Sequence, residues 1–311
     1  MTHLATEIEK LTNEHLGRTV AHVLLYNNYD LTEGSILAFL FDAGARAPFA
    51  VLKFSRSRTI LAREYENLKS VYNVDPKLAA APMFFDQTKE FFVLCMAPID
   101  ANRLSGYRAK SRKLKLVAMR LTKFHEILRS QSETATITRN DYLKPFSGLY
   151  DTELPTNVAD YYNETAIIHM DSLEKFPLKA IAQHGDLYFD NILTKGQRIY
   201  FLDWEDFGDV KMPGYDLFSL VFDICNLESG ETRLLRRSID LIAASTIDYF
   251  RKLALPVDIV DAIMSYTLVQ QYHRSWTLGR TSQVAFAKRL GVIAENEKLF
   301  RLIAEAYRKR R

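Results

Sequence analysis

The first hundred residues carry short runs of β-branched and aromatic residues, separated by turn-forming residues. This pattern is typical of strands. One segment breaks the series, because Leu61, Tyr65 and Leu68 recur at helical spacing within Thr59 to Val71. The order of three strands, one helix and two strands predicts a small antiparallel sheet with one packed helix. The runs expected to form strands are TVAHVLLY, SILAFLF, FAVLKF, APMFFD and FFVLCM.

The pattern changes after MAPIDANRLSG, whose proline and glycine are typical of a connector. Long amphipathic helices are expected from there on, with two brief strands, NILTK and IYFLD, between them. Three or four of these helices should follow Thr232, one of them starting at Pro256. We therefore expect an α+β chain of two lobes, residues 1–97 around a sheet and residues 98–311 mostly helical. The first long helix is predicted from the apolar positions Leu114, Val117, Leu121, Phe124 and Leu128.

Composition narrows the class of protein. A chain of 311 residues with 48% hydrophobic and 25% charged residues should fold into globular units rather than remain disordered. The net charge of +3 is too small to favour nucleic acid as a partner, and the basic tail RKRR is interpreted as a solvated terminus. The apolar run Phe91 to Ile99 is far shorter than the roughly 20 residues of a membrane helix, so no span is expected.

Two cysteines, Cys95 and Cys225, support neither a disulfide framework nor a zinc site. The N-terminal segment has acids where an export signal would carry basic and apolar residues. The expected location is the cytoplasm.

Polar residues gather where two predicted strands begin or end. In HGDLYFDNIL at 184–193, HGD with Asp186 precedes the strand NIL, which Asn191 begins, and Asp203 of LDWED ends the strand IYFL. Two carboxylates and an amide at adjacent strand ends can converge on a divalent cation. Magnesium is the natural candidate, because it prefers a few hard oxygen ligands together with phosphate.

These residues carry a family resemblance. His184, Asp186 and Asn191 fit the pattern HxDxxxxN, and Asp203, twelve residues after Asn191, resembles the aspartate of the kinase DFG motif. The chain thereby resembles the aminoglycoside phosphotransferase and choline kinase group, relatives of the protein kinases. The resemblance implies a bilobal protein-kinase-like fold. It also implies that Asp186 is the catalytic base, that Asn191 and Asp203 hold Mg²⁺, and that His184 braces the loop.

The resemblance extends into the first lobe. Lys53 is similar to the strand lysine that holds nucleotide phosphates, and Glu64 to the helix acid that positions it. Backbone groups of Met96 and Ala97 are expected to contact the purine. Residues 28–35, with Gly34 and Ser35, are expected to contact phosphate, although this segment has a single glycine.

Ordinary structural roles compete with several of these assignments. Lys53 could be an edge-strand lysine that favours solubility, and Glu64 could be an exposed helix acid. His125 is interpreted as a packed core histidine and Asp216 as an anchor for loop backbone. Two further acids, Glu205 and Asp206, are interpreted either as a solvated turn or as support for magnesium.

The function expected is Mg²⁺-dependent transfer of the γ-phosphate of ATP or GTP to a hydroxyl of a sugar, aminoglycoside or amino alcohol. A protein kinase is the first alternative. It is disfavoured by Tyr188, where protein kinases usually have lysine, and by the thirteen positions from Asp203 to Asp216, too few for an activation segment. The second alternative is a catalytically silent nucleotide-binding module.

The acceptor is the least determined part of this prediction. Six acids in residues 151–176 could attract a cationic acceptor, and a solvated helix face would explain them equally well. The basic stretch YRAKSRKLK at 107–115 could instead favour an anionic one. The sequence does not choose between ATP and GTP.

Overall fold

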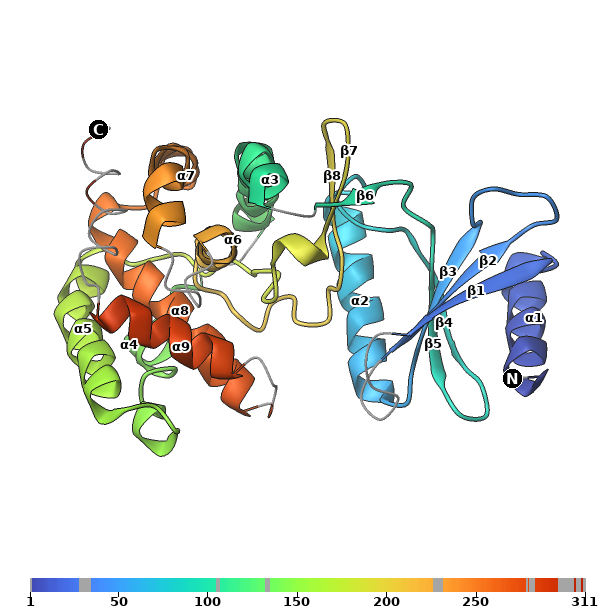
Figure 1. Ribbon diagram of the computed structural model, residues 1–311, viewed down its shortest axis with the longest axis horizontal. Helices are drawn as coiled ribbons and strands as arrows, with labels where there is room; N and C mark the ends of the chain where they lie inside the picture. Colours follow the sequence, from blue (N-terminus) through green and yellow to red (C-terminus); the bar gives the residue numbers. More distant parts are fainter. Residues whose placement is uncertain are drawn as a thin grey trace. The chain divides into compact units, whose positions relative to one another are not determined.

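The computed structural model describes residues 2–27, 35–104, 107–131, 135–225, 232–277, 279 and 283–295, together with 305 and 309. The chain forms two compact units (Figure 1). Unit 1 comprises Met1–Asn102 and Leu193–Glu205, and unit 2 comprises Arg103–Ile192 and Asp206–Arg311.

Unit 1 is built on a five-stranded antiparallel sheet with the strand order β1-β2-β3-β5-β4. All five strands that the hydrophobic runs predict are present, and so is the predicted helix, α2 (Arg58–Val74). The antiparallel sheet and the helix predicted for the first lobe are thereby confirmed. The strands are β1 (His22–Asn27), β2 (Ile36–Phe41), β3 (Ala50–Ser55), β4 (Pro82–Gln87) and β5 (Phe92–Met96).

Helix α1 (Thr2–Leu16) was not predicted. In Figure 1, α1 and α2 lie on opposite sides of the sheet. Ile8 and Leu11 of α1 pack in one buried cluster with Leu40 and Leu52 of the sheet. The spacing of Ile8 and Leu11 is typical of a helix, but this apolar stripe is narrow and surrounded by charged residues. The helix is therefore stabilised mainly by packing against the apolar face of the sheet.

A second sheet has the strand order β6-β7-β8, with β6 (Asn102–Arg103), β7 (Ile192–Lys195) and β8 (Arg198–Phe201). Both predicted brief strands are therefore present. The segment from Leu193 to Glu205 groups with unit 1 although it comes from the middle of the sequence. The Phe201 N–H donates to the Leu78 carbonyl (2.8 Å), which fixes the start of the segment that carries Asp203.

Unit 2 is mostly helical. Helices α6 (Tyr215–Cys225) and α8 (Val260–Thr277) are buried on nearly every side, so their sequences show no clean amphipathic stripe. The apolar stripe predicted for α3 (Tyr107–Gln131) is buried at Leu114, Val117 and Leu121. No described helix is long and apolar enough to cross a membrane. The other helices are α4 (Arg139–Leu143), α5 (Thr156–Lys175), α7 (Thr232–Lys252) and α9 (Gln283–Glu295), with 3₁₀ turns at Leu149–Asp151, Phe189–Asn191 and Val257–Ile259.

Candidate functional site

Lys53 lies in β3, the central strand of the five, so the edge-strand interpretation of this lysine is wrong. Ala50, Leu52 and Phe54 point into the core beneath α1, and side chains alternate along a strand. Lys53 therefore faces the opposite side of the sheet. Its side chain is only 13% exposed, so the ammonium needs a charged partner.

Glu64 is that partner. Ser57 caps the N-terminus of helix α2, because its side chain accepts a hydrogen bond from the Ile60 N–H. The buried face of α2 consists of Leu61, Glu64, Leu68 and Val71, so the acid stands in the apolar stripe. Glu64 Oε2 lies 2.7 Å from Lys53 Nζ. The interpretation of Glu64 as an exposed helix acid is wrong.

Asp203 completes a three-residue ion-pair group within unit 1. Lys53 Nζ donates to Asp203 Oδ1 over 2.8 Å. Asp203 has a φ of +63°, a left-handed conformation that costs an L-residue about 1–2 kcal/mol. The neighbouring backbone supports this conformation: the Asn67 amide donates to the carbonyls of Trp204 (2.9 Å) and Glu205 (3.2 Å). Such strain is characteristic of functional positions.

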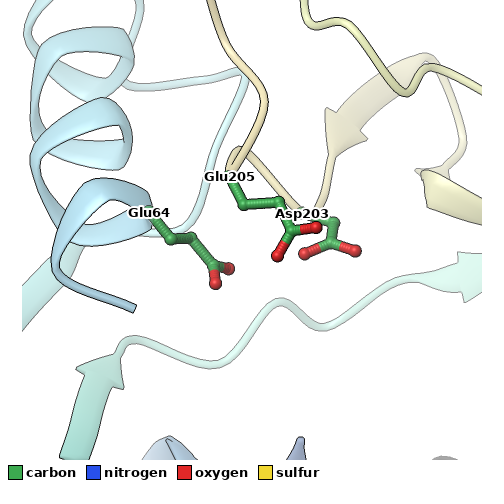
Figure 2. A group of neighbouring side chains, drawn as sticks. All are labelled: Glu64, Asp203 and Glu205. Atoms are coloured by element: carbon green, nitrogen blue, oxygen red, sulfur yellow. The ribbon is translucent and has the colours of Figure 1, made fainter. Parts of the chain in front are cut away.

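Glu205 joins this group. Figure 2 shows the carboxylates of Glu64, Asp203 and Glu205 turned toward one another, and their oxygens lie within 4.8 Å of each other. Three carboxylates at this spacing form a donor set that fits a hard divalent cation such as Mg²⁺.

Ionisation of the group reflects burial and crowding. Burial raises the pKa of Glu64 to about 7, with Lys53 opposing the shift and the charge of Asp203 adding to it. Burial alone would lower the pKa of Lys53, but the carboxylates of Glu64 and Asp203 outweigh it and hold that pKa above its usual value. Lys53 therefore stays charged beside these two carboxylates.

The remaining positions expected to contact nucleotide lie in or beside the same sheet. Met96 ends β5 and pairs with Val51 and Pro82. The Ala97 N–H already donates to the Ala81 carbonyl (2.8 Å), so a purine would have to use other backbone groups there. Ser35 precedes β2 and is half-buried, whereas Gly34 lies outside the described residues.

Asp186 belongs to unit 2 and lies in a loop whose backbone is anchored by hydrogen bonds to Asp216. Asp216 is fully buried in the first turn of α6 and accepts the backbone N–H groups of His184 (2.7 Å) and Gly185 (3.1 Å). This is the anchoring role expected of Asp216. His184 is buried, and its Nδ1 accepts the Asp186 N–H over 3.4 Å, which fits a bracing role.

Asn191 closes the same loop. It ends the 3₁₀ turn, and its side-chain nitrogen donates to the Asp186 carbonyl over 2.9 Å. The amide oxygen is then the atom that Asn191 can offer to a metal. Asp186 and Asn191 are thus held together by one short loop of unit 2.

Arg274 of α8 was not predicted from the sequence. Its Nη1 donates to the Gly185 carbonyl (2.7 Å), and its Nη2 lies 2.5 Å from Asp206 Oδ2. Asp206 is 3% exposed, so the solvated-turn interpretation is wrong for this acid. An arginine in a long helix carries no local signal that it reaches a loop 89 residues away.

Gly185 has no room for a side chain. Its φ is +88°, and a Cβ would lie 2.7 Å from the Asp206 carbonyl oxygen. The loop that presents Asp186 therefore needs glycine at this position.

A cavity of about 230 Å³ opens beside Asp186 and is lined by Tyr188, Tyr215, Arg274 and Phe286, among others. Burial, and then the charge of Asp186, raise the pKa of Tyr188 above its ordinary value. Its phenol therefore stays neutral beside the proposed base.

The acids of the segment 151–176 lie on a solvated surface. All six of its acids are exposed, and none of them lines this cavity. Asp160 accepts the Tyr150 hydroxyl (2.8 Å), and Glu174 lies 3.6 Å from Arg139. His125 is also accounted for structurally: it is fully buried, with Nδ1 2.8 Å from the Tyr249 hydroxyl.

Comparison with known proteins identifies the fold. No protein-family model matches the chain, and no curated protein matches its sequence. Solved structures do match. Aminoglycoside phosphotransferase APH(4)-Ia, in a complex with ADP and hygromycin B, has a TM-score of 0.61 and 16% identity, covering 93% of this chain and 98% of that one.

Two further structures agree. An aminoglycoside phosphotransferase of the APH(2'') type, in a complex with GDP and kanamycin, has a TM-score of 0.60 and 14% identity, covering 94% of this chain and 98% of that one. A choline/ethanolamine kinase family protein from Mesorhizobium loti has a TM-score of 0.62 and 16% identity, covering 98% and 99%. The chain has the kinase-like fold of these proteins.

Proposed function

We propose that the chain is a Mg²⁺-dependent phosphotransferase that moves the γ-phosphate of ATP or GTP to a hydroxyl of a small molecule. The observation that carries this proposal is the buried group of Lys53, Glu64 and Asp203, with Glu205 beside it. A protein that needed only a stable fold would gain little from burying these charges. The nucleotides and aminoglycosides bound by similarly folded proteins support the same reaction class.

The residues of unit 1 serve the nucleotide in this proposal. Lys53 neutralises phosphate oxygens, and Glu64 keeps its side chain extended. Asp203 and Glu205 would hold the metal ion, and the family resemblance assigns Asn191 the same role. When bound, Mg²⁺ neutralises charge on the β- and γ-phosphate oxygens.

The loop of unit 2 serves the acceptor. Asp186 accepts a hydrogen bond from the acceptor hydroxyl, orients its oxygen toward the γ-phosphate and takes the proton as the bond forms. The hydrogen bonds of Asp216, His184 and Asn191 to the loop backbone fix the position of Asp186. General-base catalysis of this kind contributes about 10²- to 10⁴-fold.

A panel of sugars, aminoglycosides and amino alcohols, screened for Mg²⁺-dependent ADP or GDP release, tests the proposal. Asp186→Asn should lower turnover at least about 10²-fold and leave nucleotide affinity unchanged. Asp190→Asn is the matched control, since Asp190 is in the same loop but its side chain is 81% exposed. Equal turnover by the two variants would reject Asp186 as the base, and phosphorylation of peptides alone would favour a protein kinase.

A further inference from the structure

We infer that the acceptor is an uncharged hydroxyl compound of a single ring, such as a monosaccharide, rather than a polyamine or a quaternary amine. This inference rests on the proposed function, because it concerns the acceptor of the reaction at Asp186. It follows from the size, the walls and the charge of the cavity beside that residue.

The size of the cavity limits the acceptor. Its volume of about 230 Å³ is below the range of about 300–1,000 Å³ that is typical of sites for drug-sized ligands. One sugar ring can enter such a space, whereas a linked set of three rings would have to leave most of its surface outside.

The walls of the cavity suit a ring with an apolar face. Tyr188 and Phe286 have ring centroids 6.4 Å apart and planes tilted by 31°, and Tyr215 also lines the space. Tyr188 and Tyr215 have pKa values raised by burial, so both phenols are neutral. Flat aromatic walls pack against the C–H face of a pyranose, while Gln271 and Ser275 add polar groups to the lining.

The charged residues of the cavity offer little to a polyamine. Among the described residues that line it, Asp186 is the single acid and Arg274 the single base. A second cation, the Arg289 guanidinium, lies over the Phe286 ring at 5.1 Å and is buried. An aromatic cage for an ammonium group would place no cation in its own wall. Asp206 balances the charge of Arg274, so a polyamine would find one acid in the described lining, and that acid is the base itself.

Saturation-transfer-difference NMR on the wild-type chain gives a readout that does not depend on turnover. Hexoses and pentoses, kanamycin, hygromycin B and choline are compared at equal concentration. The inference predicts saturation transfer to the ring protons of at least one neutral sugar, and weaker transfer to the three cations. Stronger binding of any of the cations, or no binding of any neutral sugar, would overturn it.

Variants of α9 then test the aromatic wall. Phe286→Ala should raise the KM for the preferred sugar at least tenfold and leave the KM for ATP unchanged, and Phe286→Tyr should restore most of the affinity. Val284→Ala is the matched control on the same helix, because Val284 is 69% exposed. If Phe286→Tyr loses as much affinity as Phe286→Ala while both remain folded, the stacking argument fails.

The two proposals fail in different ways. Sugar binding without any nucleotide-dependent phosphorylation would reject the proposed phosphotransferase activity, but the cavity would still be a binding site for a neutral sugar. Rapid phosphorylation of kanamycin or choline, with neutral sugars inactive, would retain the phosphotransferase and reject the inference.

Discussion

The Arg274–Asp206 pair makes a quantitative prediction about unit 2. The two side chains are 15% and 4% exposed, and the Arg274 guanidinium also binds the Gly185 carbonyl. Replacing one partner of a buried pair leaves an uncompensated charge and typically costs about 3–5 kcal/mol. We expect a cost of this size for Arg274→Met and for Asp206→Asn. The double variant should cost at least about 2 kcal/mol less than the sum, because neither charge is then left alone.

Tryptophan fluorescence can measure this loss in the free energy of unfolding within unit 2. The chain has two tryptophans, Trp204 in unit 1 and Trp276 in α8. In a Trp204→Phe background, the emission of Trp276 reports urea unfolding of the helix that carries Arg274. The midpoint and the slope give the free energy of unfolding for each variant.

A solvent-exposed pair provides the control. Arg251 and Asp248 lie 2.6 Å apart with 73% and 42% exposure, so Arg251→Met should cost no more than about 1 kcal/mol. The reasoning is refuted if Arg274→Met costs as little as this control, or if the effects of Arg274→Met and Asp206→Asn are additive.

Three further substitutions should separate loop geometry from nucleotide binding. Gly185→Ala should abolish turnover, because the new Cβ would collide with the backbone of Asp206. Its free energy of unfolding should fall by more than the cost of a left-handed alanine, about 1–2 kcal/mol. Gly196→Ala, at a φ of +62° with no atom within 4 Å of the new Cβ, should show only that smaller cost in the same urea titration. Asp216→Ala should cost about 1–3 kcal/mol for each of the two buried N–H groups it leaves without an acceptor, measured by urea unfolding, and a loss under 1 kcal/mol would contradict the anchoring role. Lys53→Met should weaken ATP binding at least about tenfold in titration calorimetry. The control Lys69→Met, which changes an exposed lysine of α2, should bind ATP as the wild type does. Equal ATP affinities of the two variants would show that Lys53 does not bind the nucleotide.

The sequence predicts the sheet and its helix because each strand and the face of α2 bury a regular apolar set. Glu64 shows where pattern alone falls short, since an acid in an apolar stripe looks like an exposed helix residue until its partner is known. The family resemblance supplied that partner, Lys53, and the structure places the two side chains in contact.

The contacts of Arg274 and the orientation of Glu205 could not be predicted from the sequence, although support for magnesium is one of the two interpretations of Glu205 that the sequence offers. Arg274 acts on a loop far away in the chain, and its neighbours in α8 give no sign of that contact. Glu205 adjoins Asp203, yet its direction depends on the left-handed backbone at Asp203 and on the Asn67 hydrogen bonds. Both depend on tertiary geometry that no local pattern encodes.

The proposed roles of Asn191 and Asp203 as ligands of Mg²⁺ are tested most directly by the Mg²⁺ dependence of ATP affinity in titration calorimetry. Mg²⁺ should increase the ATP affinity of Asn191→Ala and of Asp203→Ala at least about tenfold less than it increases that of the wild type. The control Asp190→Asn should retain the full Mg²⁺ effect. ATP binding by either alanine variant with the wild-type Mg²⁺ dependence would contradict these roles.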